Sequence, residues 1–464
     1  MREGFVRAML ATRIFTFSQL WSLGLGFGLV VFVLQRLLRY VCAHVVEFDC
    51  PYYWPVSIFD VVRPTLSRCL VAAGSLLLFV LAVRYLSKRR YPLGAVVVAG
   101  ILLVIASNLI QGWYVGLYTP VAGDARSGQL IPVSTDGQEY YHDALAVQDP
   151  VQFLRDYATI QPTLHRHALT HPPGAVLVFY VLATLLVDPG LVAVFIAVVS
   201  VSFSCLFLYG ILKDDVGPDT ARYVTFLFTL LPAVQIYFLA SLDALVTALL
   251  IGALFFFTRP NATRSIAGSA AMLLLAFQLT FVTVLILPVL AGCEFLRRRS
   301  VLRAAAVIAA VLASQVLIYA LSAYDPIRAF RVASAYENPH GFTGLIDPVN
   351  YLFTRLEDVA ELLLFFGPFL LVLLMRDSRT TRGKESRAWD LALLASGTIL
   401  VMFMTGAFRT GETARPLAFL YACWLLPVGH YLDGLRPSDS GRAQLATLVF
   451  GQTIFMQLLG NFFW

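Results

Sequence analysis

The chain has 464 residues, of which 59% are hydrophobic and only 13% are charged, and its formal net charge is +6 at pH 7. A soluble protein needs about 25% charged residues to cover its surface, so this composition excludes an ordinary soluble enzyme of two or three domains. The basic residues lie in short stretches between long apolar runs, which favours anchoring at a membrane surface and argues against a nucleic-acid partner. We therefore expect a multi-pass integral membrane protein.

The charge-poor runs predict an all-α fold, a polytopic transmembrane helical bundle of about 13 spans, because roughly 20 apolar residues cross a bilayer. These runs lie near residues 17–38, 68–84, 92–110, 173–187, 190–212, 222–238, 241–258, 265–293, 301–321, 359–375, 389–406, 416–433 and 443–461. The runs 173–187 and 359–375 are short for full spans, and residues 222–258 also allow another division around Pro232.

Basic clusters set the predicted orientation. Placing Lys88–Arg90, Arg297–Arg303 and Arg376–Arg387 inside also places the N-terminus inside, and thirteen spans satisfy all these assignments. The same alternation puts two long loops, 111–172 and 322–358, on the outer face. Both loops carry aromatic residues, prolines and acids, so we expect them to be folded.

The first outer loop contains the densest acidic stretch. Asp136, Glu139 or Tyr140, and Asp143 fall at helical spacing on one face. Such a face is either simply solvated, or it faces a positive group or a reacting proton. Asp149-Pro150 predicts the start of a short helix on the membrane surface.

This loop returns to the membrane through His165, His167 and His171, followed by Pro172-Pro173. The prolines stop a preceding helix and pre-set the next one, so they hold His171 at the interface. The histidine spacing matches no strong metal signature, and a phosphate-binding or substrate-orienting role for His171 is favoured over a metal site.

The second outer loop supplies Glu337 and His340 as candidates for substrate binding. Glu361 opens the following apolar span, where an unpaired charge is costly, and we predict that it pairs with Arg355.

A short third outer loop contains Arg409, Glu412 and Arg415. These side chains form either an internal salt-bridge network or a clamp for an anionic head group, since arginine suits phosphate. Asp243 is predicted near the inner end of its span, as a helix N-cap.

Taken together, these features resemble the GT-C superfamily of integral-membrane glycosyltransferases. The resemblance rests on the many spans, the acidic stretch 136–141, Pro172-Pro173, and a later outer loop with arginine and glutamate. It covers residues 92–464, and residues 1–91 would then be two accessory N-terminal helices. Two features depart from the family pattern: the acidic loop follows the third span instead of the first, and the acids are spaced instead of adjacent.

The resemblance implies transfer of a sugar from a polyprenyl- or dolichyl-phosphate-linked donor to a glycan, lipid or protein acceptor on the outer or lumenal face. A single displacement with inversion is expected. Asp136 would be the general base, with Asp143 as the alternate, and Glu139 would orient the acceptor or a metal. His171, Arg409 and Arg415 would hold the phosphate. The predicted substrate-binding set is completed by Tyr140, Glu337, His340 and Glu412. No organic cofactor is implied, and a divalent metal is left open.

Two other classes compete with this interpretation. A transporter or lipid-linked sugar flippase would carry charges within its spans, whereas here the charges concentrate in loops. An envelope polysaccharide polymerase or ligase would depend on arginine and histidine instead of a carboxylate base. The plasma membrane of a prokaryote is the favoured location, with the endoplasmic reticulum membrane as the alternative.

Overall fold

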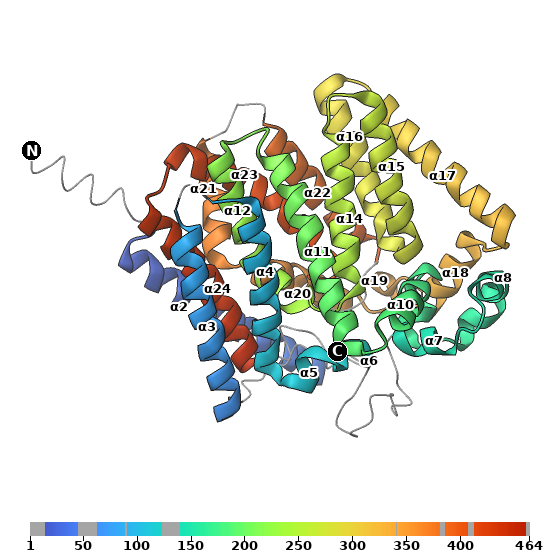
Figure 1. Cartoon of the computed structure of the whole chain (residues 1–464), viewed down its shortest axis with the longest axis horizontal. Helices are drawn as coiled ribbons and strands as arrows, with labels where there is room; N and C mark the ends of the chain where they lie inside the picture. Colours follow the sequence, from blue (N-terminus) through green and yellow to red (C-terminus); the bar gives the residue numbers. More distant parts are fainter. Residues whose placement is uncertain are drawn as a thin grey trace, which may run out of the picture.

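A computed structural model describes residues 14–44, 63–88, 91–122, 140–339, 341–380, 386–406 and 413–460. Helices and short connections make up this part of the chain, and no strand occurs in it (Figure 1). The predicted all-α fold class is therefore confirmed.

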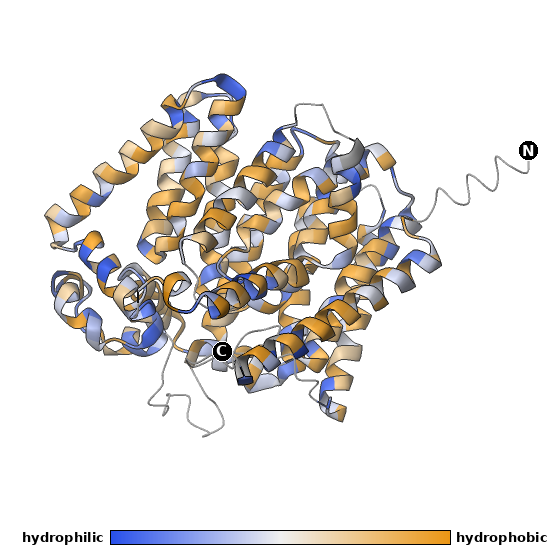
Figure 2. Ribbon diagram, turned by 180° about the vertical axis from the view of Figure 1, so that it is seen from behind, coloured by the Kyte–Doolittle hydropathy of each residue, from blue (hydrophilic) through white to orange (hydrophobic). Residues whose placement is uncertain are grey.

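Seven helices are long and apolar enough to cross a membrane, and an eighth crossing is added if one bent pair counts as a single span. The seven are α2 (Phe17–His44), α3 (Leu66–Leu86), α4 (Leu93–Asn108), α11 (Pro189–Leu212), α15 (Ala262–Leu279), α17 (Leu302–Ser322) and α22 (Arg387–Met404). The bent pair is α20 (Pro348–Phe366) and α21 (Pro368–Thr380), which meet at 94°. Apolar residues run along these helices, as Figure 2 shows. A multi-pass membrane protein fits this pattern, although these criteria alone do not yield thirteen spans.

The remaining helices complete the bundle and cover one of its ends. They are α5 (Trp113–Leu117), α6 (Thr119–Ala122), α7 (Tyr140–Ala146), α8 (Pro150–Ile160), α9 (Arg166–Leu169), α10 (Gly174–Leu186), α12 (Pro218–Leu230), α13 (Pro232–Tyr237), α14 (Leu242–Phe257), α16 (Ile286–Arg298), α18 (Pro326–Glu337), α19 (Thr343–Ile346), α23 (Phe419–Leu435) and α24 (Asp439–Leu459), with 3-10 turns at Leu109–Gln111 (η1), Gln161–Thr163 (η3) and Phe281–Leu285 (η4). Residues 223–240, in α12 and α13, are all buried and form the centre of the core.

Several helix termini meet at one end of the bundle, which we call the basic end. Arg387, at the start of α22, pairs with Asp215 beyond α11 at 2.7 Å. The backbone N–H of Arg303, at the start of α17, donates to the carboxylate of Glu294 in α16 at 3.1 Å. The side chain of Arg303 donates to the carbonyl of Arg259, just beyond α14. The ends of α11, α14 and α16 therefore lie beside the starts of α15, α17 and α22.

This arrangement shows that the predicted single span 265–293 is wrong. α15 starts from the basic end and α16 returns to it, so the run is two helices joined through η4. Pro288 lies in the first turn of α16, where a proline is tolerated because the N–H group that it lacks would have no partner within the helix. Thr280 ends α15 in an extended conformation, with φ −157° and ψ 146°.

The opposite end carries α7, α8 and α9 with His165, His167 and His171, and we call it the histidine end (Figure 1). The predicted span 173–187 stays there. α10 has 13 residues, or about 20 Å of helix, and it starts three residues after His171 at the histidine end. Its far end also stays beside α7, because the Tyr141 hydroxyl donates to the carbonyl of Val187. α11 therefore runs from the histidine end to the basic end.

The helices α11, α12, α13 and α14 therefore run between the two ends of the bundle in the direction opposite to the predicted one, whereas α17 runs in the predicted direction. Asp243, predicted near the inner end, consequently lies at the histidine end, where it pairs with Arg415. Charge counting could not reveal this because residues 188–258 contain few basic residues to fix their direction.

The short helix predicted after Asp149-Pro150 is confirmed. α8 begins at Pro150, and the Asp149 carboxylate accepts hydrogen bonds from the backbone N–H groups of Val151 and Gln152. The side chain of an acidic N-cap thus satisfies donors that the helix itself leaves unpaired.

Candidate functional site

Tyr140 brings two of the loop histidines together at the histidine end. Its ring stacks on Phe179 of α10, with centroids 5.5 Å apart and planes 11° apart. The edge of the same ring meets His171 at 5.3 Å, and His167 lies 5.9 Å away. Aromatic packing against α10 therefore fixes the place where the first outer loop rejoins the bundle.

His171 is held in one orientation by backbone groups. Its Nδ1 lies 2.8 Å from the carbonyl oxygen of His167, and because a carbonyl only accepts, Nδ1 must carry the hydrogen. Its own carbonyl accepts a 2.6 Å hydrogen bond from the Tyr157 hydroxyl. In neutral His171 the lone pair is consequently on Nε2, which can act as a hydrogen-bond acceptor.

Electrostatics favour this neutral form. Burial lowers the pKa of His171; Asp243 opposes this effect, and the positive charge of Arg415 adds to it. Burial also lowers the pKa of His167 well below its ordinary value, with further lowering by Arg415 and His171. Both imidazoles are therefore neutral at pH 7.

Arg415 pairs with Asp243, with Nε and Oδ2 3.0 Å apart. Their side chains are 15% and 13% exposed, so the pair is partly open to a ligand. Asp243 lies in the first turn of α14, where the helix dipole favours a negative charge. The prediction that Asp243 caps this helix is wrong, because the cap is Ser241, whose hydroxyl accepts the backbone N–H of Asp243 at 3.0 Å.

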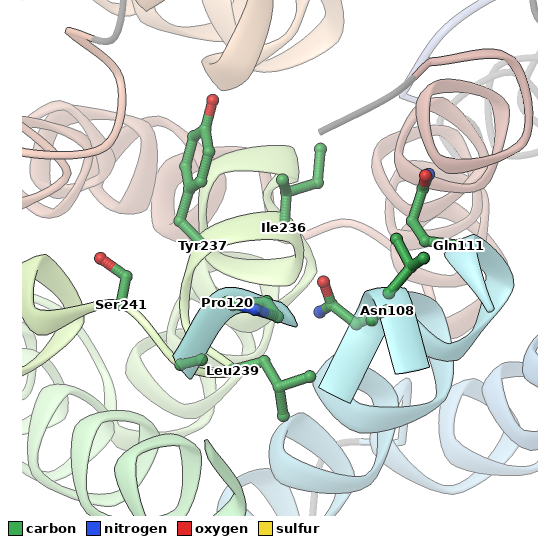
Figure 3. Close-up of a pocket in the computed structure, with 10 residues that line it drawn as sticks. Asn108, Gln111, Pro120, Ile236, Tyr237, Leu239 and Ser241 are labelled. Atoms are coloured by element: carbon green, nitrogen blue, oxygen red, sulfur yellow. The ribbon is translucent and has the colours of Figure 1, made fainter. Parts of the chain in front are cut away.

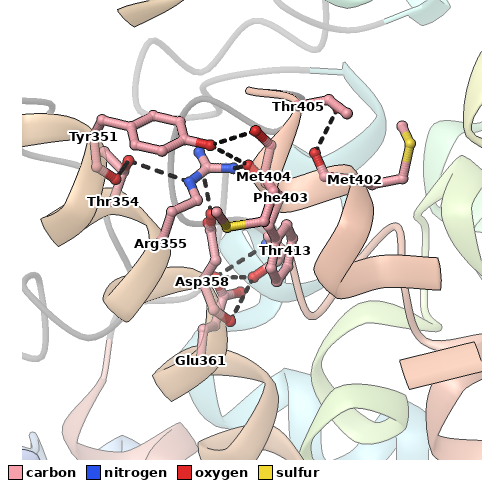
Figure 4. Close-up of polar contacts among 10 residues, drawn as sticks. All are labelled: Tyr351, Thr354, Arg355, Asp358, Glu361, Met402, Phe403, Met404, Thr405 and Thr413. Carbon is pink, nitrogen blue, oxygen red and sulfur yellow. Dashed lines mark hydrogen bonds and ion pairs between the residues drawn. The ribbon is translucent and has the colours of Figure 1, made fainter. Parts of the chain in front are cut away.

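Glu361 of α20 binds the segment that leads to Arg415. The fully buried carboxylate accepts the backbone N–H and the hydroxyl of Thr413, both at 3.0 Å, and the backbone N–H of Ala414 at 3.1 Å (Figure 4). The predicted pairing of Glu361 with Arg355 is therefore wrong. A carboxylate inside an apolar bundle is satisfied here by backbone donors instead of by a neighbouring cation.

Arg355 instead pairs with Asp358, one helical turn along α20, at 3.3 Å. Its guanidinium also donates to the carbonyl of Phe403 at 3.1 Å, and it lies over the ring of Tyr351 (Figure 4). The buried face of α20 is thus charged, and it joins α20 to the end of α22.

Asp143, the alternate predicted base, is engaged in the loop itself. It accepts hydrogen bonds from the backbone N–H of His165 at 3.1 Å and from Nδ1 of the same residue at 2.9 Å. It is only 8% exposed. This geometry fits a residue that shapes the loop better than one that receives a proton from a substrate.

A pocket of about 300 Å³, counted with its open mouth, adjoins Ser241 (Figure 3). Asn108 and Gln111, at the end of α4, line it together with Tyr237 of α13. Asn108 donates to the carbonyl of Gln235, so its amide is already used in holding α4 against α13. No sequence pattern predicts this pocket, because its walls come from helices that are distant in sequence.

Of the ten predicted site residues, the structure describes Tyr140, Asp143, His171, Glu337 and Arg415. It brings Tyr140, His171 and Arg415 together, whereas Asp143 binds His165 and Glu337 ends α18. The other five lie outside the described residues: Asp136, Glu139, His340, Arg409 and Glu412.

Asp243 is the residue that sequence reasoning missed. An acid beside the first turn of an apolar span is a usable signal, but its partner is far away in sequence. Among the described residues, no group of three or more histidine, cysteine, aspartate or glutamate side chains could hold a metal ion. The divalent metal considered above would involve Glu139, which lies outside those residues, and stays a prediction.

Comparison with known proteins identifies no relative. No family model matches the chain, and neither a curated protein nor a solved structure matches it. The likeness to GT-C glycosyltransferases therefore rests on the sequence features alone.

Proposed function

We propose that the protein is a membrane glycosyltransferase that moves a sugar from a polyprenyl- or dolichyl-phosphate donor to an acceptor at the histidine end. The observation that carries this proposal is that Tyr140 packs against His171 at one end of an apolar bundle, where Asp243 pairs with Arg415 near enough for both charges to act on His171. A lipid-linked substrate needs such a place, because its prenyl chain stays in the bilayer while its phosphate and sugar need polar partners.

The proposed topology has thirteen crossings. They are α2, α3, α4, α11, α12 with α13, α14, α15, η4 with α16, α17, α21, α22, α23 and α24. With the basic end inside, as the excess of arginine and lysine favours, the histidine end faces outward. The helices α7 to α10 and α18 to α20 then lie on the outer side as the folded outer loops.

The proposed chemistry assigns complementary roles to these side chains. Arg415 stabilises the negative charge that grows on the phosphate as the bond to the sugar breaks. Neutral His171 accepts a hydrogen bond at Nε2, so it orients a sugar hydroxyl instead of donating to phosphate. Asp136 precedes Tyr140 by four residues and is proposed as the base that activates the acceptor hydroxyl. A single displacement inverts the anomeric carbon.

The test uses the purified full chain in lipid nanodiscs, with a panel of prenyl-phosphate-linked hexoses and pentoses and labelled transfer as the readout. Asp136→Asn should reduce transfer by about 100-fold or more, as expected for loss of a general base. Asp143→Asn is the matched control and should have a smaller effect, because Asp143 binds His165. Full transfer by Asp136→Asn would exclude this base, and absence of transfer from every donor would exclude the enzyme class.

The rival functions give different results with the same purified chain. A transporter or flippase, reconstituted into liposomes because nanodiscs enclose no compartment, moves labelled substrate across the bilayer without making a glycosidic bond. A polymerase or ligase loses activity on replacement of Arg415 or His171 and keeps it in Asp136→Asn. Among the described residues, the partly open charged cluster lies at a bundle end, which favours surface chemistry over transport through the midplane.

A further inference from the structure

We propose that Asp243 and Glu361 are positioning residues that together present Arg415 to the phosphate of the lipid-linked substrate. The inference rests on the proposed function and assigns roles to two acids that the sequence pattern placed elsewhere. Asp243 acts on the side chain of Arg415, and Glu361 acts on the backbone just before it.

Glu361 holds the backbone immediately before Arg415. Arg415 follows Thr413 and Ala414, whose N–H groups both bind the Glu361 carboxylate at 3.0 and 3.1 Å. Thr413 and Ala414 are fully buried, and so is Glu361. Two hydrogen bonds from adjacent residues to one carboxylate fix the direction of the backbone against α20. The Cα of Arg415, the next residue, therefore has a defined position relative to this helix.

The ion pair with Asp243 orients the side chain of Arg415. A free arginine side chain has about 2 kcal/mol of rotamer entropy, which a ligand would otherwise have to remove on binding. Asp243 contacts Nε, on the stem side of the guanidinium, at 3.0 Å. Asp243 is itself fixed in the first turn of α14 by the Ser241 cap. The guanidinium is therefore oriented before a phosphate arrives, which is the usual advantage of preorganisation.

The two histidines near the ion pair are consistent with this role. Burial and the charge of Arg415 lower the pKa of His167 and of His171, and both imidazoles are neutral at pH 7. Because both imidazoles are neutral, the cations near this cluster are Arg415 and Arg166, and Arg166 is exposed to solvent. Asp243 also lowers the local positive charge, so its removal would tighten phosphate binding if charge alone mattered. For Asp243→Asn, a positioning role therefore predicts weaker phosphate binding, whereas an effect of charge alone predicts tighter phosphate binding.

The experiment measures binding of farnesyl phosphate, with farnesol as the uncharged control, to the full chain in nanodiscs. Arg415→Gln should weaken binding of farnesyl phosphate by at least about 10-fold and leave farnesol unchanged. Asp243→Asn should weaken it by about 10-fold, and Asp243→Glu, which keeps the charge, should retain most of the affinity. Asp390→Asn breaks a 2.7 Å pair with Arg297 at the basic end and should have no effect on binding.

A charge exchange separates positioning from a purely structural role. Asp243→Arg combined with Arg415→Asp restores the ion pair, so it should recover the melting temperature lost in the single variants. It should not recover farnesyl phosphate binding, because the cation then starts from α14.

The outcomes are distinguishable. Normal or tighter binding by Asp243→Asn, with binding lost in Arg415→Gln, would overturn the positioning role and leave the proposed function standing. Recovery of both stability and binding by the exchange would overturn it as well. Normal binding by Arg415→Gln would instead remove the phosphate role of Arg415 from the proposed function.

The role of Glu361 is tested with the steady-state constants of transfer. Thr413→Val removes one hydroxyl and keeps both backbone bonds to Glu361, so it is the matched control. Glu361→Gln should lower kcat/KM for the prenyl-phosphate donor by about 10-fold, because a tilted Arg415 contacts the phosphate less well both in the bound donor and in the transition state. A kcat/KM for the donor equal to that of Thr413→Val would exclude Glu361 from positioning.

Discussion

Replacing Glu361 tests how the segment before Arg415 is held in the bundle. The carboxylate is fully buried and receives three hydrogen bonds, two from backbone N–H groups and one from the Thr413 hydroxyl. Glu361→Ala leaves both N–H groups without an acceptor in the apolar interior. Since α20 joins the histidine end through this contact, the substitution should destabilise the fold as well as the site.

The expected loss in the free energy of unfolding follows from the individual hydrogen bonds of Glu361. Each buried N–H left unsatisfied costs about 1–3 kcal/mol, so Glu361→Ala should lower the free energy of unfolding by about 4 kcal/mol. Glu361→Gln keeps one acceptor oxygen, but its amide NH₂ faces the second N–H group, which gives a loss of about 2 kcal/mol. Thr413→Val removes only the hydroxyl, which contacts Glu361 at 3.0 Å and the carbonyl of Asp358 at 3.2 Å, and should cost about 1 kcal/mol.

The assay is thermal unfolding of the detergent-solubilised full chain, followed by tryptophan fluorescence at one scan rate, because membrane proteins of this size often unfold irreversibly. The melting temperatures should fall in the order wild type, Thr413→Val, Glu361→Gln, Glu361→Ala. If Glu361→Ala melts at the wild-type temperature, the three hydrogen bonds do not hold this segment. If Thr413→Val is the most damaging variant, the hydroxyl matters more than the backbone bonds, and the reasoning fails.

Three further predictions test the packing, the topology and the electrostatics. Gly174→Ala would place a Cβ 2.3 Å from a backbone oxygen of α15 and should cost about 2 kcal/mol in a melting assay, whereas Gly397→Ala meets nothing within 4 Å and should stabilise slightly. A cysteine at Lys213, in a chain without its native cysteines, should react with a membrane-impermeant maleimide only from the cytoplasmic side; reaction from outside intact cells would contradict the orientation of α11. By ¹⁵N NMR of histidine, Asp243→Asn should lower the pKa of His171 further and Arg415→Gln should raise it, since the two charges act in opposite directions; shifts of the same sign would rule out this arrangement.

The apolar runs and basic clusters determined the class of this protein before any tertiary contact was considered. The long continuous apolar runs indicate helices in a membrane, because a helix satisfies its own backbone groups in a bilayer, whereas the strands of a membrane barrel alternate apolar and polar residues. Local signals were also sufficient for α8, where Asp149 and Pro150 define a helix start through contacts within one turn. Interactions of this kind depend on neighbours along the chain, so the sequence contains them directly.

The site depended on contacts between distant segments, which the tertiary structure alone decided. Asp243 reaches Arg415, and Glu361 binds the N–H groups of Thr413 and Ala414, across gaps that no spacing rule covers. A local rule paired Glu361 with Arg355 because the two are close in sequence, but in a folded bundle a buried carboxylate binds whichever donors the packing places beside it. Hydropathy could not show that α10 stays at one end and that 265–293 folds back, since an apolar run has the same composition whether it crosses the bilayer once, twice or not at all.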